Sequence, residues 1–328
     1  MTDLIGGATV ISAKTVPGVA HSMGYKAANL PLASLLLACC CCAAAFSQDS
    51  TAQSTEASPT AVVAQAREEL HLIPAVAADG QIVQLHARIC RPPTDAPAPL
   101  VVINHGSPPS ASDRPGMQLG RCDQEAARWF TSRGYVVAFA LRRGYGATGG
   151  NWDENYGSCA QSDYARAGIE TAKDINAVVN YASALPYVLH DGAIVVGQSA
   201  GGWGTIAYDA LPHRRVSAFV VMAGGRGGHQ NNQPFQNCHP ERLIEGARSF
   251  GKHATTPMLW IYSANDSFFP PPLARALWQA FTSAGGKATL EQPGPFGDDG
   301  HHLFFGSGGS LVWGPLLERY LAGQRPGG

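Results

Sequence analysis

The sequence is poor in charge. Only 14% of its 328 residues are Asp, Glu, Lys or Arg, and its formal net charge is −1, whereas an average soluble protein has roughly 25% charged residues. A nearly neutral chain offers no electrostatic basis for binding nucleic acid. The low charge, combined with 38 Gly and 23 Pro, argues against a coiled coil, a helical repeat or a charged disordered tail. We expect one large or two ordinary globular domains with many tight turns.

The sequence also lacks the short motifs that hold common cofactors. None of the cysteines after position 42 has the C-x-x-C spacing of zinc sites, and no G-x-x-x-x-G-K-[ST] phosphate loop occurs. Residues 144–149 spell G-x-G-x-x-G, but a dinucleotide site needs a helix to open at the third glycine, and a loop-like segment follows here. We therefore expect neither a cofactor nor a metal ion.

One long apolar run lies near the N-terminus, at residues 30–46, preceded by Lys26 and followed by small polar residues. This pattern predicts a secretory signal over residues 1–47, with Met23 as an alternative start. A lipoprotein signal with a lipid on Cys39 is the second interpretation. A membrane anchor is the third, although the run is marginal in length and contains a proline. All three export the domain, to the periplasm or the medium, and only this segment or its lipid would contact a membrane.

Residues 48–68 are small, polar and interrupted by proline, which is typical of a flexible linker. Beyond them, residues 69–323 alternate strand and helix patterns. Residues 70–77 and 81–89 predict a hairpin that turns at Asp79-Gly80. Further strands are expected at 100–103, 135–141, 193–196, 218–222, 258–262 and 288–291. Helices are expected at 122–133, 162–185, 203–211, 273–284 and 311–321.

This alternation predicts an α/β domain with a mainly parallel sheet, an antiparallel leading hairpin and helices on both faces. Residues 223–256 interrupt the alternation with a Gly-, Asn- and Gln-rich loop and one short helix near 241–250. We interpret this segment as a small lid inserted over the C-terminal edge of the sheet.

The most specific chemical signal is Gly197-Gln198-Ser199-Ala200-Gly201, which matches G-x-S-x-G. A buried strand pattern precedes it and a helix pattern follows. In that setting the serine lies on a strained turn that lifts its hydroxyl clear of the sheet, and the glycines avoid collisions with neighbouring elements. Ser199 is therefore the expected nucleophile.

A serine nucleophile needs a base and an orienting acid, which in this kind of fold follow in the order Ser, acid, His. His301 and His302 lie between the last strand and the last helix, and we favour His301 because it directly follows Gly300. The acid should follow the preceding strand, which favours Asp266, although that residue would also suit a helix N-cap. The rivals of Asp266 lie close to His301 in the sequence: Asp298 and Asp299.

An oxyanion hole requires two backbone N–H groups aimed at the developing negative charge. Ala200 supplies one, and Ser107 supplies the other after Gly106 lets the loop turn close to the substrate. The segments around the motif also suggest residues at the substrate pocket. These are Tyr145 with Arg142 and Arg143 at its mouth, then Trp203, Phe268 and His302.

Half of the cysteines lie beyond the signal: Cys90, Cys122, Cys159 and Cys238. In an oxidising compartment they allow up to two disulfides. Cys159 and Cys238 both fall in loops at the catalytic edge, so we predict that they bond and fix the lid. Cys90 and Cys122 are left open between a disulfide and buried free thiols.

Together these segments resemble the α/β-hydrolase superfamily, and in particular its dienelactone hydrolase-like and prolyl oligopeptidase-like esterases. The resemblance rests on motifs that fall in the family order and spans residues 69–323: NHGSP (104–108), RRGYG (142–146), GQSAGG (197–202), YSANDSFF (262–269) and GDDGHHLF (297–304). It implies an α/β-hydrolase fold and a Ser-His-Asp triad that hydrolyses a small-molecule ester without a cofactor.

The sequence departs from both named branches. Dienelactone hydrolases use a cysteine nucleophile, where this chain has Ser199, and prolyl oligopeptidases carry a propeller for which this sequence has no room. The segment 223–256 is polar, unlike the apolar lid of large lipases. We expect an exported serine esterase. The alternatives are a serine peptidase or amidase, a dienelactone-type lactone hydrolase, and a binding protein without turnover.

Overall fold

The structure, a computed structural model, describes residues 67–214 and 216–324. The predicted signal segment 1–47, with its start at Met23 and its lipid site at Cys39, lies outside these residues, as does nearly all of the linker 48–68. No helix in the described ranges is long and apolar enough to cross a membrane.

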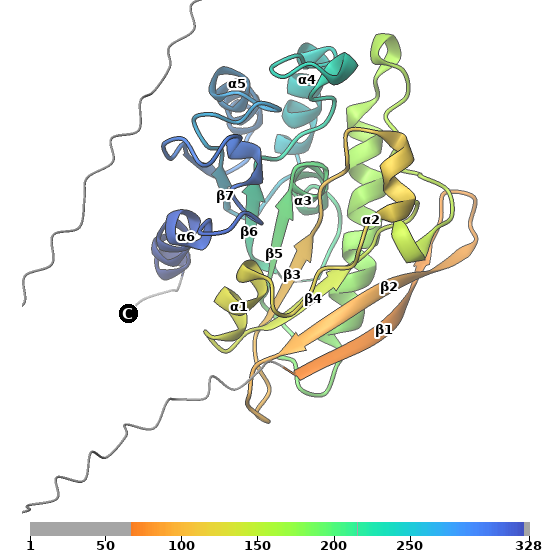
Figure 1. Cartoon of the computed structure of the whole chain (residues 1–328), viewed down its shortest axis with the longest axis vertical. Helices are drawn as coiled ribbons and strands as arrows, with labels where there is room; N and C mark the ends of the chain where they lie inside the picture. The colour runs from red at the N-terminus through yellow and green to blue at the C-terminus, as the bar shows by residue number, and fades with distance from the viewer. Residues whose placement is uncertain (1–66, 215, 325–328) are drawn as a thin grey trace, which may run out of the picture. The chain divides into compact units, whose positions relative to one another are not determined.

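Within the described residues, an eight-stranded sheet runs through the domain in the order β1-β2-β4-β3-β5-β6-β7-β8 (Figure 1). From β4 to β8 in this order the neighbours are parallel, whereas β2 is antiparallel to both β1 and β4. The predicted architecture, a mainly parallel sheet with an antiparallel leading hairpin, is confirmed. The strands are β1 (Arg67–Val76), β2 (Ile82–Arg91), β3 (Leu100–Asn104), β4 (Val136–Ala140), β5 (Ala193–Gln198), β6 (Val216–Met222), β7 (Met258–Ile261) and β8 (Ala288–Glu291).

The alternation of side chains along each strand divides the core into two layers. In β3, Leu100 and Val102 face one layer, and Val101 and Ile103 face the other. The first layer lies under α2, α3, α4 and α5, and the second under α1 and α6. The helices are α1 (Glu125–Thr131), α2 (Tyr164–Ser183), α3 (Ala200–Asp209), α4 (Pro240–Gly251), α5 (Pro271–Ser283) and α6 (Ser310–Gln324).

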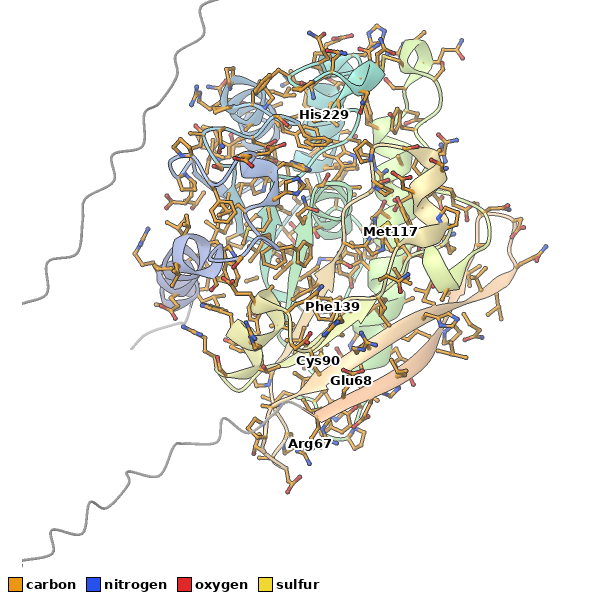
Figure 2. The ribbon with its side chains drawn as sticks, in the orientation of Figure 1. Arg67, Glu68, Cys90, Met117, Phe139 and His229 are labelled. Carbon is orange, nitrogen blue, oxygen red and sulfur yellow. A yellow bond between two sulfur atoms is a disulfide. The ribbon has the colours of Figure 1, made fainter. Side chains whose placement is uncertain are left out.

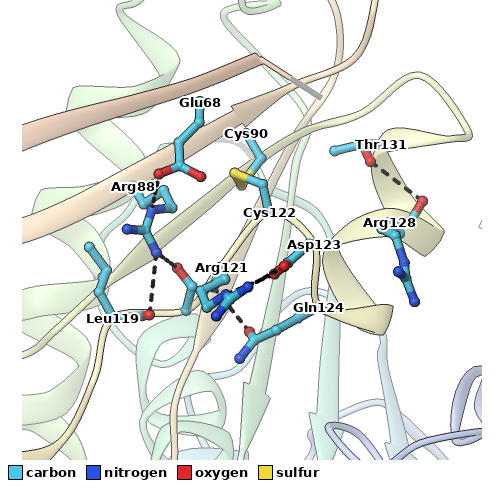
Figure 3. Close-up of a disulfide and its surroundings, with 11 residues drawn as sticks. Glu68, Arg88, Cys90, Leu119, Arg121, Cys122, Asp123, Gln124, Arg128 and Thr131 are labelled. Atoms are coloured by element: carbon cyan, nitrogen blue, oxygen red, sulfur yellow. Dashed lines mark hydrogen bonds and ion pairs between the residues drawn. A yellow bond between two sulfur atoms is a disulfide. The ribbon is translucent and has the colours of Figure 1, made fainter. Parts of the chain in front are cut away.

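The leading hairpin is anchored covalently to the sheet's second layer (Figure 3). Cys90 at the end of β2 forms a disulfide with Cys122, which lies just before α1, with an S–S distance of 2.06 Å. Next to it, the Arg88 guanidinium lies 2.8 Å from the Glu68 carboxylate. Of the two alternatives that the sequence left open for Cys90 and Cys122, the structure shows the disulfide.

The segment 223–256 has two parts with different surroundings. Its helix α4 belongs to the helical layer, because Leu243 and Phe250 are buried in the core. Its first half is loop, with left-handed backbone at His229 and His239. Figure 2 shows His229 at the end of the domain opposite to Arg67. Helix α4 is therefore part of the core, and the predicted lid is restricted to the loop that precedes this helix.

Candidate active site

Ser199 occupies a strained turn between β5 and α3. Its backbone has φ 54° and ψ −119°, a left-handed conformation that is costly for a residue with a side chain. The turn is tight because a Cβ on Gly197 would lie 2.3 Å from Gly201 O, and a Cβ on Gly201 would lie 2.5 Å from Asn104 O. Helix α3 consequently starts at Ala200, three residues earlier than the sequence predicted. Close packing overrides the low helix propensity of the glycines.

His301 and Asp266 form a buried pair on neighbouring loops after β8 and β7. The imidazole Nδ1 lies 3.1 Å from Asp266 Oδ1 and 3.2 Å from Oδ2. Asp266 Oδ1 also accepts the backbone N–H groups of Phe268 and Phe269, at 2.9 and 2.8 Å. Asp266 therefore ties its own loop and orients the imidazole. It does not cap α5, which begins at Pro271.

Of the two rival acids, Asp299 supports both loops and Asp298 is exposed. Asp299 Oδ1 accepts the backbone N–H of His301 at 2.9 Å and that of Ser267 at 3.0 Å. Burial alone would raise the pKa of Asp299, but the hydrogen bonds from Ser267 and His301 hold that pKa below its ordinary value. Asp299 thus remains a carboxylate that joins the loop of the acid to the loop of the base.

Ser199 and His301 make no direct hydrogen bond in the described residues, and they are linked through the residues next to them. The Gln198 side chain donates to His301 O at 3.1 Å. The ring of Phe268 stacks on the imidazole, with centroids 4.1 Å apart, and lines the same cavity as Ser199. On its other face Phe268 stacks on His229, with centroids 3.5 Å apart. The imidazole is therefore held by aromatic contacts, and its backbone is tied to the residue before the serine.

The two expected oxyanion donors lie at the same cavity as Ser199. Ser107 and Ala200 both line it, and neither backbone N–H donates to another described residue. Gly106 allows the approach, because a Cβ there would meet Gln198 Oε1 at 2.4 Å and Ser199 Cβ at 3.0 Å. Two free N–H groups beside a serine hydroxyl can bind an oxyanion.

The cavity at Ser199 is small, about 80 Å³. Arg114 and Trp152 form one part of its wall, with the guanidinium stacked 3.7 Å from the ring centroid. Phe268 was among the predicted pocket residues and does line it. The complete lining is Ser107, Pro108, Pro109, Arg114, Trp152, Tyr156, Ser199, Ala200, Gly225, Arg226, Gly227, Gly228, Phe268 and Phe269.

The structure corrects the other pocket predictions. Tyr145 is fully buried and donates its hydroxyl to Glu154. Trp203 is also fully buried, and its Nε1 donates to Tyr164 O at 2.7 Å, so it belongs to the core. His302 is exposed and lies outside the cavity lining. A residue at the end of a strand can turn toward either the cavity or the core, and strand pattern alone does not distinguish the two.

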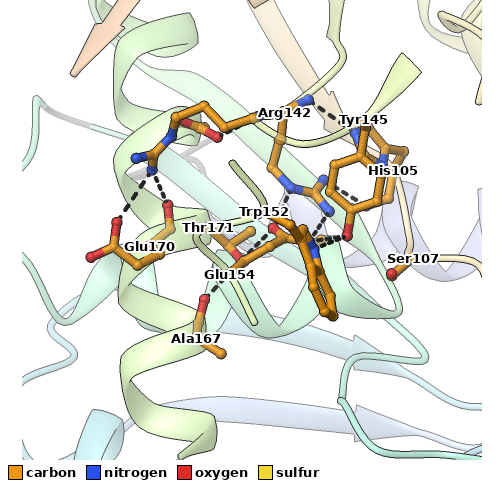
Figure 4. A network of polar contacts seen from close by, with 12 residues as sticks. His105, Ser107, Arg142, Tyr145, Trp152, Glu154, Ala167, Glu170 and Thr171 are labelled. Carbon is orange, nitrogen blue, oxygen red and sulfur yellow. Dashed lines mark hydrogen bonds and ion pairs between the residues drawn. The ribbon is translucent and has the colours of Figure 1, made fainter. Parts of the chain in front are cut away.

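Arg142 and Arg143, expected at the mouth of the site, are buried in ion pairs (Figure 4). Arg142 Nε lies 2.8 Å from Glu154 Oε2, and Arg143 Nε lies 2.7 Å from Asp174 Oδ1. Buried charges need such partners. Arg142 also donates its backbone N–H to His105 Nε2 at 3.2 Å. Burial and the charge of Arg142 lower the pKa of His105 to about 3, so this histidine is neutral and structural.

The predicted disulfide partners lie beside the loop that follows β6. Cys159 and Cys238 are joined in the structure. The backbone N–H of Cys238 donates to Gly227 O at 2.8 Å, and the Tyr164 hydroxyl donates to Cys238 O. Cys159–Cys238 therefore holds the loop that lines the cavity against α2. Sequence reasoning missed the cavity residue of this loop, Arg226, although its position directly after a parallel strand was a usable signal.

No group of three or more His, Cys, Asp or Glu side chains in the described residues is arranged to hold a metal ion. The site as described consists of a serine, an imidazole–carboxylate pair and free backbone N–H groups. This combination suits nucleophilic acyl transfer.

Residues 122–225 match the prolyl oligopeptidase family. The match includes Ser199 and ends before Asp266 and His301. Solved structures with the same arrangement of sheet and helices include acylaminoacyl peptidase from Pyrococcus horikoshii, at TM-score 0.57 and 15% identity over 78% of this chain. The chain therefore has the fold of the α/β-hydrolases. No curated protein matches the sequence.

Two smaller α/β-hydrolases are similar along nearly their whole length. A Klebsiella pneumoniae protein described as a dienelactone hydrolase has TM-score 0.51 and 16% identity, over 78% of this chain and 98% of its own. The Est1E protein of Butyrivibrio proteoclasticus, solved with ferulic acid, has TM-score 0.50 and 17% identity, over 76% and 98%. By contrast, this chain spans only 41% of the Pyrococcus peptidase.

Proposed function

We propose that this α/β-hydrolase is an exported serine esterase that cleaves short carboxylic esters through an acyl-enzyme. The observation that carries the proposal is the strained conformation of Ser199 at a cavity that is also lined by Ser107 and Ala200, whose N–H groups have no partner among the described residues. A strained backbone persists where it serves function, and here the strained turn exposes the Ser199 hydroxyl at the cavity.

In the proposed reaction, Ser199 Oγ attacks the ester carbonyl while His301 Nε2 takes its proton. Asp266 keeps the proton on Nδ1 and stabilises the imidazolium. The N–H groups of Ser107 and Ala200 hold the oxyanion of the tetrahedral intermediate. His301 then protonates the departing alcohol, and a water molecule, deprotonated by His301, cleaves the acyl-enzyme. The Ser199–His301 hydrogen bond forms when substrate binds, as free enzymes often have longer catalytic contacts.

A serine peptidase or amidase is the second candidate. It is favoured by the match to the prolyl oligopeptidase family over residues 122–225 and by the likeness to the acylaminoacyl peptidase fold. The small cavity of about 80 Å³ favours a short acyl group over a peptide. A lactone is a cyclic ester, so a dienelactone-type hydrolase would use the same steps.

Export is part of the proposal. The described residues contain disulfides Cys90–Cys122 and Cys159–Cys238, and such bonds persist in oxidising compartments. This supports the signal segment that the sequence predicts.

The test is to compare p-nitrophenyl acetate, butyrate and octanoate with p-nitroacetanilide, the amide that matches the acetate. Ser199→Ala removes the nucleophile, and Ser307→Ala, an exposed serine, is the matched control. We expect ester turnover that declines with chain length, is lost in Ser199→Ala and is unchanged in Ser307→Ala. Comparable turnover of the anilide would favour the amidase. Equal rates in wild type and Ser199→Ala would contradict both.

A further inference from the structure

Arg226 brings a buried positive charge to the wall of the cavity. Its side chain is 2% exposed, and it lines the cavity together with Ser199. The residue before it, Gly225, donates its backbone N–H to Ser199 O at 3.1 Å. The backbone just before Arg226 is thus tied to the turn that presents the nucleophile.

The hydrogen-bonding capacity of this guanidinium is only partly used. Nη2 donates to Thr171 Oγ1 at 2.8 Å and lies 3.0 Å from Glu154 Oε1. Nε is buried without a partner, and Nη1 makes no hydrogen bond to a residue in the described ranges. Leaving buried charged donors unpaired is costly, so this arrangement suits a site that an anion completes.

The pairing of Glu154 points the same way. Glu154 forms ion pairs with two guanidinium groups. Its Oε1 lies 3.0 Å from Arg226 Nη2, and its Oε2 lies 2.8 Å from Arg142 Nε. Tyr145 and Thr171 also donate to this carboxylate. The other carboxylates nearby are paired with Arg143 instead: Asp153, Glu170 and Asp174.

Among the described residues, the cavity wall contains a second cation and no acidic side chain. Arg114 lines it and has no ion pair among the described residues. Its guanidinium stacks on Trp152, which leaves its N–H edge free to bind. Two arginines at a small, otherwise uncharged cavity form a setting for a planar anion, because the guanidinium fork matches a carboxylate.

We propose that Arg226, assisted by Arg114, binds a free carboxylate of the substrate, so that the preferred substrates are short half-esters of dicarboxylic acids. This inference rests on the proposed function for the ester part. The carboxylate takes Nη1 of Arg226, which has no partner among the described residues, while the ester carbonyl lies at Ser199. The small cavity, of about 80 Å³, favours a spacer of a few carbon atoms between the two groups.

The test compares monoethyl succinate with ethyl levulinate, in which a methyl group replaces one carboxylate oxygen. For the wild type we expect kcat/KM to favour monoethyl succinate by about tenfold or more, as a charge-assisted hydrogen bond would give. Arg226→Gln should reduce this ratio by about tenfold, and Arg226→Lys, which keeps the charge but loses the fork, should fall between. An unchanged ratio in Arg226→Gln would overturn the proposal.

A binding measurement separates the anion site from the esterase activity. Succinate is titrated calorimetrically into Ser199→Ala, with succinamide as the neutral control, so the result depends neither on turnover nor on the folding of an Arg226 variant. We expect succinate to bind and succinamide not to bind. The protein could hydrolyse ethyl levulinate as well as the anionic ester and bind no succinate. That result would contradict the anion site and agree with the proposed esterase activity. Succinate binding without turnover of any ester contradicts the esterase alone.

Discussion

Asp299 accepts the backbone N–H of His301 at 2.9 Å, and so fixes the residue proposed as the catalytic base from two positions earlier in the chain. The same oxygen accepts the N–H of Ser267, which directly follows Asp266. One carboxylate therefore sets the distance between the loop of the acid and the loop of the base, although it does not touch the imidazole.

Replacing Asp299 should therefore reduce the rate without removing the reaction. We expect Asp299→Ala to lower kcat for p-nitrophenyl acetate by about a hundredfold with little change in KM, because a displacement of about 1 Å at a catalytic group costs that much. Asp298→Ala, at the exposed neighbouring position, is the control and should behave as wild type. Equal loss in the two variants would argue against a positioning role.

The close contact between Gly201 and the end of β3 predicts a large effect on stability. A Cβ at Gly201 would lie 2.5 Å from the carbonyl oxygens of both Asn104 and His105. These are backbone atoms of β3 and the loop after it, so relieving the clash requires a shift of the main chain. We expect Gly201→Ala to lower the free energy of unfolding by about 2–4 kcal/mol, as overpacked core sites do. Gly323 lies in α6 with no atom within 4 Å of an added Cβ, so Gly323→Ala should be neutral or slightly stabilising. Urea unfolding of both variants measures the difference, and similar values would refute the packing argument.

His105 predicts a specific dependence of stability on pH. Its pKa in the folded protein is about 3, against an ordinary value of 6.5. Below pH 6.5 the His105 imidazole binds a proton in the unfolded chain, whereas in the folded protein it does so only near pH 3. The free energy of unfolding therefore falls as the pH drops from 6.5 toward 3. The loss from pH 7.5 to pH 5 is about 2 kcal/mol.

His105→Gln keeps an acceptor for the Arg142 N–H and cannot titrate. Its free energy of unfolding, measured in urea at pH 7.5 and pH 5, should drop by about 2 kcal/mol less than that of the wild type. Other groups titrate alike in both proteins and cancel in the comparison. The same drop in both would show that His105 takes up its proton at an ordinary pH.

The nucleophile turn and the mainly parallel sheet with its leading hairpin could be predicted because their signals are local. A buried strand, G-x-S-x-G and a helix pattern lie within about twenty residues, and the Cβ contacts at Gly197 and Gly201 explain why glycine is needed there. Asp266 and His301 followed from one further rule, the chain order Ser, acid, His, with each residue in the loop after one of the last strands. The structure brings these two side chains together.

The parts that the sequence did not reveal depend on contacts between distant segments. Arg226 meets Glu154 across α2, and nothing local to either residue indicates the pairing. Tyr145 and Trp203 were predicted to line the pocket, yet both are fully buried in the core. Sequence pattern locates a residue along an element, whereas the direction of its side chain is decided by packing.

The central claim is that Ser199 is an activated nucleophile, and a fluorophosphonate probe tests it most directly, since the probe labels activated serines whatever the natural substrate. Intact mass spectrometry and peptide mapping should find one covalent adduct, on Ser199, absent from Ser199→Ala, formed far more slowly in His301→Ala and unchanged in Ser307→Ala. An unlabelled wild-type protein, or an adduct on another residue, would contradict the account.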